Sequence, residues 1–147
     1  MRRVALIGMN NPLSVNPRRA LWPDPPNCTG WRIWQMLRAR TGATQEDYIG
    51  AFHRYNLGTE KHWNLSRARE RWDDIQDDLI ENFDTIVLLG AAVRLAAGVH
   101  LPQLYVSSTM VCIPHPSGLN RWYNSDVNRR IVEVILEELY AEAVLGA

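Results

Sequence analysis

The chain has 147 residues, 46% of them hydrophobic, and its 16 basic side chains balance 16 acidic ones. This length and apolar content predict a single folded domain over residues 1–147 and exclude a collagen-like or wholly disordered chain. A formal net charge of zero excludes the strongly basic overall balance of many nucleic-acid-binding proteins, although it allows a local basic patch.

Neither a membrane segment nor a signal peptide is visible in the sequence. The longest apolar run, residues 86–93, is far below the ~20 residues that a membrane span needs. Residues 4–7 are too few for a signal-peptide core. We therefore expect a cytoplasmic protein that has no membrane partner.

The sequence also lacks the motifs of common cofactor and metal sites. It contains neither a glycine-rich dinucleotide motif nor a P-loop, so we expect no cofactor. Cys28 and Cys112 lie far apart and are expected to be free thiols. We expect no metal, because the four histidines fall on different predicted elements without ligand spacing: His53, His62, His100 and His115.

The chain begins with a predicted buried strand over residues 3–9, a run of aliphatic and β-branched side chains. Residues 11–30 contain five prolines and form a predicted loop, because proline blocks helix and removes a backbone donor. Thr29 or Gly30 is the candidate N-cap of a helix over residues 31–40. A loop of this length inside a small domain is typically functional.

Strands and helices alternate along the rest of the chain. Apolar side chains at spacings of three and four predict an amphipathic helix over residues 64–81, with charged residues on its solvated faces. The remaining predicted elements are strands over 48–55, 84–89 and 103–113 and helices over 91–97 and 125–143. This alternation predicts an α/β protein, a three-layer α/β/α sandwich with a central four-stranded parallel sheet.

Ligands of such sheets bind at the carboxyl ends of the strands, which here carry loops rich in Asn, Trp and His. Asn10 directly follows the first strand, and a side-chain amide at this place could hold a water molecule or a ligand. Asn10 could equally be a turn former, since asparagine is common in turns. The loop after the fourth predicted strand is more specific, because His115 lies between Pro114 and Pro116 and is held rigidly.

Two segments together resemble the uracil-DNA glycosylase superfamily: Gly8-Met9-Asn10 at the end of the first strand, and His115-Pro116-Ser117-Gly118-Leu119-Asn120-Arg121 after the fourth. Three further stretches resemble its mismatch-specific uracil/thymine branch. They are Leu21-Trp22-Pro23 with Asn27, Trp31 and Trp34; Val87-Leu88-Leu89-Gly90 with Val93 and Gly98; and the terminal helix. The resemblance covers nearly the whole chain in the right order.

The resemblance implies a monomer that flips a base out of DNA and hydrolyses its N-glycosidic bond. Asn10 would position the attacking water or steady the sugar cation, and His115 would stabilise the charge on the departing base. Trp22 would stack on the base, and Leu119 would enter the gap left in the duplex. The remaining implied contacts are Met9, Asn11, His53 and Asn56 at the base, and Ser117, Gly118, Asn120 and Arg121 at the DNA backbone.

The first motif departs from the family, which places a proline directly after the catalytic Asn or Asp. Here Asn11 intervenes, so the functional amide is either Asn10 or Asn11. Three alternatives to a uracil glycosylase stay open: a same-fold enzyme acting on a modified base or free nucleotide, a catalytically silent nucleotide- or protein-binding module, and a generic flavodoxin-like domain. A glycosylase requires a pocket joining Asn10 and His115 with a positive rim from Arg18, Arg19, Arg121, Arg129 and Arg130.

Overall fold

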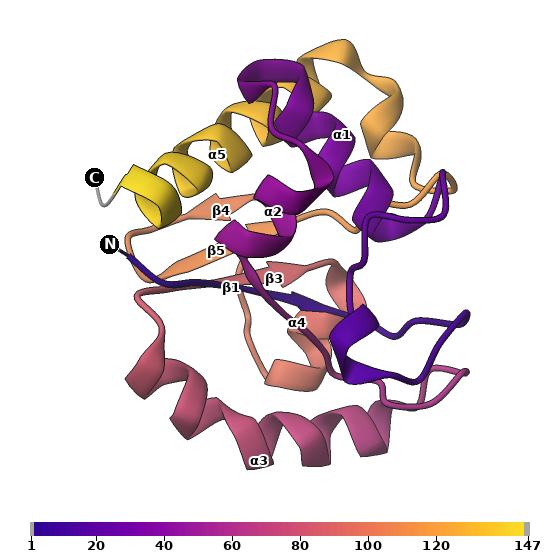
Figure 1. The fold of residues 1–147 in the computed structure, drawn as a ribbon. Coiled ribbons are helices and arrows are strands. Elements are labelled where there is room, and N and C mark those ends of the chain that lie inside the picture. Colours follow the sequence, from indigo (N-terminus) through magenta and orange to yellow (C-terminus); the bar gives the residue numbers. More distant parts are fainter. Residues whose placement is uncertain (1, 146–147) are drawn as a thin grey trace.

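The centre of the protein is a five-stranded sheet with the strand order β2-β1-β3-β5-β4 (Figure 1). The computed structural model describes residues 2–145. The strands are β1 (Val4–Gly8), β2 (His53–Asn56), β3 (Thr85–Leu89), β4 (Tyr105–Val106) and β5 (Met110–Ile113). β1, β2, β3 and β5 run parallel, and β4 pairs antiparallel with β5.

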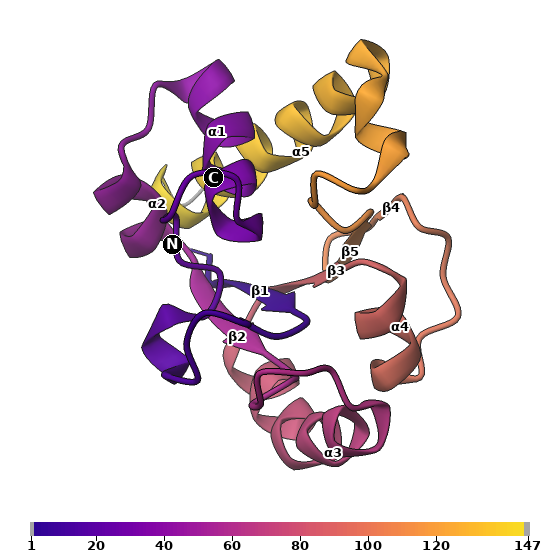
Figure 2. The ribbon, with the colours of Figure 1, turned by 90° about the vertical axis from the view of Figure 1, so that its right-hand side faces the viewer.

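Helices cover both faces of this sheet, so the predicted α/β architecture with three layers is confirmed (Figure 2). One layer contains α1 (Thr29–Thr41), α2 (Gln45–Ala51) and α5 (Asp126–Leu145). The opposite layer contains α3 (Leu65–Asn82) and α4 (Ala91–Ala97). Short 3-10 helices lie in the loops at Pro17–Arg19 and Arg121–Asn124.

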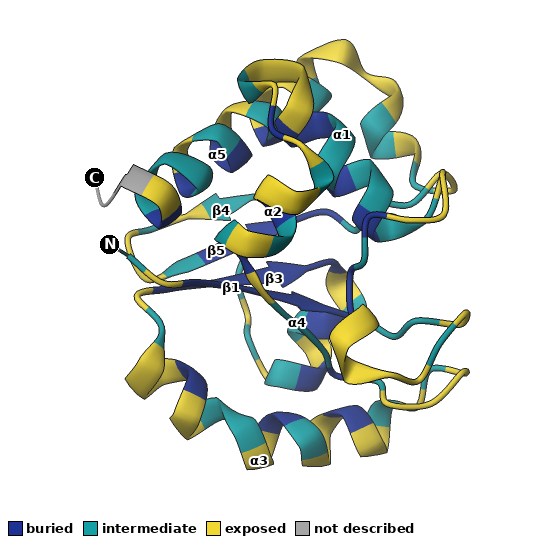
Figure 3. Cartoon of the chain, in the orientation of Figure 1, coloured by how far each residue is buried: buried dark blue, intermediate teal, exposed yellow. Residues whose placement is uncertain are grey.

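Two apolar cores flank the central strands, which are buried on both faces (Figure 3). Leu6 and Val87 belong to the core under α1, α2 and α5, whereas Ile7 and Leu88 belong to the core over α3 and α4. Successive side chains of a strand point to opposite faces, so a strand between two helical layers is apolar at every position. This explains the continuous apolar runs of β1 and β3.

The predicted strand over residues 48–55 is wrong in its first half, which forms the helix α2. Thr44 and Asp47 form a capping box at the start of this helix, each side chain accepting a hydrogen bond from the other residue's backbone N–H. The strand β2 begins only at His53, after the extended residue Phe52. The aromatic and β-branched composition of residues 48–55 favours a strand. The Thr-x-x-Asp pattern of residues 44–47 is the local signal for the helix that forms instead.

The predicted strand over residues 103–113 is also wrong, because the segment folds back on itself as the hairpin β4–β5. The side chain of Ser107 closes the turn: its hydroxyl donates to the carbonyl of Met110 and accepts from the Met110 N–H. The sheet therefore has five strands and is mixed, instead of four parallel strands. Serines at residues 107–108 are the local signal for this turn.

The predicted helices over residues 64–81, 91–97 and 125–143 are confirmed, with boundaries shifted by two residues at most. The helix predicted over residues 31–40 starts earlier, and its N-cap is neither Thr29 nor Gly30. Cys28 caps it, with Sγ accepting from the backbone N–H of Trp31 at 3.5 Å. Cys28 and the buried Cys112 are both free thiols.

The first loop approaches α1 so closely that only glycine fits at residue 30. A Cβ atom on Gly30 would lie 2.3 Å from the carbonyl oxygen of Leu21 and 2.2 Å from that of Trp22. Because backbone atoms cannot move aside cheaply, we expect Gly30→Ala to lower the free energy of unfolding by about 1–3 kcal/mol in urea denaturation.

Gly50 provides the matched control for this substitution, because a Cβ atom there would meet nothing within 4 Å. Gly50→Ala in α2 should raise the free energy of unfolding by up to about 1 kcal/mol, as alanine is the better helix former. Equal effects of the two substitutions would contradict the close approach at Gly30.

Candidate functional site

The loops that follow β1, β2 and β5 lie together beyond the carboxyl ends of the strands, on the right-hand side of Figure 1. A cavity of about 170 Å³, which we call the loop cavity, lies among the loop after β1, the start of α1, the last residue of β2 and the loop after β5. Its lining includes five predicted site residues, namely Asn10, Asn11, Trp22, Asn56 and Ser117. The fold thus brings together Asn10 and Ser117, which are 107 positions apart in the sequence.

Side chains of neighbouring elements fix the part of the first loop that carries Trp22. Three consecutive carbonyl oxygens accept hydrogen bonds: that of Ala20 from Arg54, that of Leu21 from the buried hydroxyl of Tyr48, and that of Trp22 from Cys28. Burial raises the pKa of Tyr48, which keeps its hydroxyl protonated as a donor. Leu21 has a positive φ of 50°, an unusual conformation for a branched side chain that these contacts maintain.

Two arginine side chains hold the indole ring of Trp22. The guanidinium carbon of Arg19 lies 4.7 Å from the ring centroid, and that of Arg54 lies 5.3 Å from it. Both distances are within the range of a cation–π interaction. The ring is therefore oriented before any ligand binds. The sequence alone does not predict a role for Arg54, because only the fold places β2 beside the first loop.

The side-chain amide of Asn10 is oriented by the loop that follows β2. Its Nδ2 donates to the carbonyl oxygens of Lys61 at 2.7 Å and Glu60 at 3.3 Å. Because these partners are acceptors, the nitrogen must point to them and the oxygen must point away. Within residues 2–145, Oδ1 of Asn10 accepts no hydrogen bond, so it can accept one from water or a ligand.

Asn11 differs, because both ends of its amide are used within the first loop. Its Nδ2 donates to the carbonyl oxygen of Arg19 at 3.1 Å, and its Oδ1 accepts from the backbone N–H of Leu13 at 2.9 Å. The second contact is an Asx-turn, a common way in which asparagine shapes a loop. These contacts favour Asn10 over Asn11 as the amide that faces a ligand.

Asn56 closes the loop cavity at the carboxyl end of β2. Its Oδ1 is buried and has no hydrogen-bond partner among the residues that the structure describes. A Cβ atom on Gly8 would lie 2.7 Å from this oxygen, so glycine leaves the space that Asn56 occupies. A buried acceptor without a partner costs about 1–3 kcal/mol. Because this oxygen has almost no accessible surface, a ligand N–H reaches it only after neighbouring atoms move aside.

His115 follows β5 and is held by the backbone around it. Its carbonyl oxygen accepts from the backbone N–H of Ser117 and from Nδ2 of Asn120, and its Cβ atom lies against Gly90 at the end of β3. Burial lowers the pKa of His115, so its imidazole is neutral at pH 7. His115 does not line the loop cavity, although Ser117 of the same loop does. The expected pocket that joins Asn10 and His115 is therefore absent from the cavities of the described residues, because His115 is held back against Gly90.

The remaining predicted residues of this loop have distinct environments. Leu119 is 94% exposed at the loop tip, and Arg121 is exposed nearby. Asn120 holds the loop, since its Oδ1 accepts from Trp122 while its Nδ2 binds His115. The side chain of Arg32 lies over Gly118 and donates to the carbonyl oxygen of Asn27, so it joins the two loops.

Two predicted base contacts lie away from the loop cavity. His53 is at the amino end of β2, where its ring contacts the ring of Phe83 at a centroid distance of 4.9 Å. The side chain of Met9 packs with the core over α3 and α4. Strand alternation explains the position of His53, because His53 and Asn56 occupy opposite ends of β2 and their side chains point to opposite faces.

The predicted positive rim is present in part. Arg18, Arg19 and Arg121 lie in the loops around the cavity and form no ion pair with a carboxylate within the described part of the chain. Arg129 is paired with Asp126, and Arg130 lines an apolar groove beside β4 instead. Arg32, which the sequence reasoning overlooked, adds a charge between the two loops.

Comparison of the chain with protein-family models, with curated proteins and with solved structures finds no match. Residues 2–145 contain no cluster of three or more His, Cys, Asp or Glu side chains that could hold a metal ion. No helix in the same range is long and apolar enough to cross a membrane. The glycosylase resemblance therefore rests on the site residues themselves.

The buried state of His115 predicts how stability depends on pH. Its pKa is below 6.5 in the folded protein, so the unfolded chain binds more protons as the pH falls through 6.5. The free energy of unfolding should therefore decrease from pH 7 towards pH 5. In urea titrations, His115→Gln should reduce this decrease, whereas the same decrease in the variant would contradict a buried neutral His115.

Proposed function

We propose that this protein is a DNA glycosylase of the uracil-DNA glycosylase type, which hydrolyses the N-glycosidic bond of uracil or a related mismatched or modified base flipped out of DNA. The observation that carries this proposal is the loop cavity. Its lining brings together Asn10, whose amide oxygen accepts no hydrogen bond within residues 2–145, Asn56, and Trp22, whose ring is held by two arginines.

The size of the loop cavity favours a single base over a larger ligand. Its volume of about 170 Å³ is below the ~300–1,000 Å³ typical of pockets for drug-sized ligands. A heterocyclic base fits such a space, but a whole free nucleotide is larger. This supports a flipped base, whose sugar and phosphates stay outside the cavity, over the alternative of an enzyme that acts on free nucleotides.

Asn56 supports a preference for uracil or thymine over cytosine. Oδ1 of Asn56 has almost no accessible surface, so this preference requires a rearrangement on binding that exposes it to the base. The exposed oxygen then needs an N–H donor, which uracil and thymine carry at N3. Cytosine presents an acceptor at the same ring position, so its binding would leave two acceptors facing each other. A site that holds an unpaired buried polar group discriminates strongly against ligands that fail to satisfy it.

In the proposed reaction a water oxygen bonds to C1′ of the sugar while the bond from C1′ to the base nitrogen breaks. The base leaves with the bonding electron pair, and the proton from water goes to solvent or to the departing base. Oδ1 of Asn10 accepts a hydrogen bond from this water and positions it. An amide is not a general base, so the reaction depends on stabilisation of the leaving group.

His115 is the proposed source of that stabilisation. Because His115 does not line the loop cavity, its loop would have to shift towards the bound base. The neutral imidazole would then donate one N–H to the base oxygen on which negative charge develops. The prolines on both sides and the contacts to its carbonyl hold it in place beforehand. Leu119, nearly fully exposed at the tip of the same loop, would fill the gap in the duplex. Arg18, Arg19, Arg32 and Arg121 would lie near the phosphates.

The proposal is tested by strand cleavage after alkali treatment of labelled oligonucleotides that carry uracil opposite G, uracil opposite A, thymine opposite G, or uracil in a single strand. Wild type should produce abasic sites in at least one of them. His115→Ala should lower the single-turnover rate by about 10²–10³-fold, as expected for removal of one donor to a developing anion. Asn10→Ala should lower it by about 10²-fold through misplacement of the water.

Two matched asparagine variants control this experiment. Asn82→Ala, at the exposed end of α3, should leave the rate unchanged. Asn11→Ala removes two hydrogen bonds of the first loop, so it should lower the unfolding temperature. It should lower the cleavage rate much less than Asn10→Ala does. An unmodified protein that cleaves none of the four oligonucleotides at a large enzyme excess would refute the glycosylase proposal and favour a silent binding module.

A further inference from the structure

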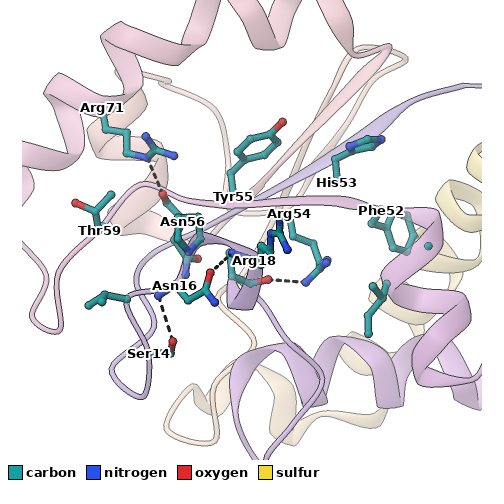
Figure 4. A pocket seen from close by; sticks show the side chains of 16 residues that line it. Ser14, Asn16, Arg18, Phe52, His53, Arg54, Tyr55, Asn56, Thr59 and Arg71 are labelled. Carbon is teal, nitrogen blue, oxygen red and sulfur yellow. Dashed lines mark hydrogen bonds between the residues drawn. The ribbon is translucent and has the colours of Figure 1, made fainter.

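A second and larger cavity opens beside the edge strand β2, which is hydrogen-bonded only to β1. We call it the edge cavity. Its volume is about 430 Å³, and it lies between the first loop, the end of α2, the loop after β2 and α3 (Figure 4). Asn56 lines both this cavity and the loop cavity, so the two cavities adjoin at this residue.

The edge cavity carries positive charge that no carboxylate neutralises. Arg18, Arg54 and Arg71 line it, and its lining contains no Asp or Glu. None of the three forms an ion pair within residues 2–145, and the nearby Glu60 is already paired with Arg67. Three guanidinium groups around one space repel each other unless an anion lies between them.

The arginines are also positioned by the protein itself. Nε of Arg71 donates to the carbonyl oxygen of Asn56 at 3.2 Å, and Nη1 of Arg54 donates to that of Ala20 at 3.0 Å. Nε of Arg54 is buried without a partner among the described residues. The remaining guanidinium donors are available to a ligand, and the planar fork of arginine suits phosphate oxygens.

The two ends of the edge cavity differ in chemistry. Figure 4 shows Arg71, Thr59 and Asn56 at one end, and Phe52 and His53 at the other. Ile49 adds a further apolar side chain from α2 to the lining. A volume of about 430 Å³ is within the ~300–1,000 Å³ range of small-molecule pockets. Phe52 is almost fully buried and the ring of His53 packs on Phe83, so this end is an apolar wall without an open ring face. The cavity thus suits a ligand with an anionic group and a less polar body.

We propose that the edge cavity binds a nucleotide through its phosphate, held by Arg18 and Arg71, with the sugar and base directed towards Phe52. The nucleotide is either a free nucleoside monophosphate or one residue of a single strand, because both present the same phosphate and ring. This inference rests on the edge cavity alone. It holds whether or not the loop cavity carries out glycosylase chemistry.

Titration calorimetry tests it with cytosine ligands, which the proposed glycosylase does not cleave. Deoxycytidine 5′-monophosphate should bind at least about tenfold more tightly than deoxycytidine, which lacks the phosphate. Equal binding of the two, or binding of neither the monophosphate nor an oligonucleotide of ten deoxycytidines, would overturn the proposal. Displacement of the monophosphate by the oligonucleotide would identify a strand as the source, and tight binding of the monophosphate alone would identify the free nucleotide.

Charge-removing variants locate the binding to this cavity. Arg71→Gln and Arg18→Gln should each weaken binding of the tighter ligand by about tenfold, the effect of one charge-assisted contact, whereas Arg71→Lys should retain part of it. Arg69→Gln, on an exposed position of α3 outside the cavity, is the matched control and should bind normally. Equal losses in the Arg69 and Arg71 variants would show general attraction to a basic surface and would overturn the assigned site.

Discussion

The carbonyl groups of residues 20–22 form the constraint on which the site depends. Each accepts a hydrogen bond from a different element: Arg54 on β2, Tyr48 on α2, and Cys28 at the start of α1. A proline-rich loop has few backbone donors of its own, so such side-chain contacts must fix it. They place Trp22 at the loop cavity and maintain the positive φ of Leu21.

Two residues of β2, Arg54 and Asn56, connect the surroundings of the two cavities. Arg54 contributes to both environments, because it lies over the ring of Trp22 and also lines the edge cavity. Asn56, two residues further along β2, lines both cavities. The edge strand β2 therefore ends the sheet on one side and contributes polar side chains to the lining of both cavities.

A formal net charge of zero does not mean that acidic and basic side chains are spread evenly over the protein. Exposed acidic residues are concentrated on the outer face of α3, and others lie along α5, where Glu137 and Glu142 pair with arginines. Arg18, Arg19 and Arg121 lie in the loops at the carboxyl ends of the strands and form no ion pair within the described residues. The net charge of the whole chain therefore does not determine the electrostatic field at the site. The field of an exposed charge is screened beyond about 10 Å at ordinary ionic strength, so only nearby side chains contribute.

The sequence by itself determined β1, β3 and the helices α3, α4 and α5, because continuous apolar runs and helical periodicity are local patterns that burial imposes directly. It did not determine α2 or the β4–β5 hairpin, where a capping box and a serine turn outweighed β propensity. Only the tertiary structure shows how the amides of Asn10 and Asn11 differ in their hydrogen bonds, places His53 away from the loop cavity and brings Arg32 and Arg54 beside the loops. Those outcomes depend on hydrogen bonds between segments far apart in the sequence, and no local pattern records such contacts.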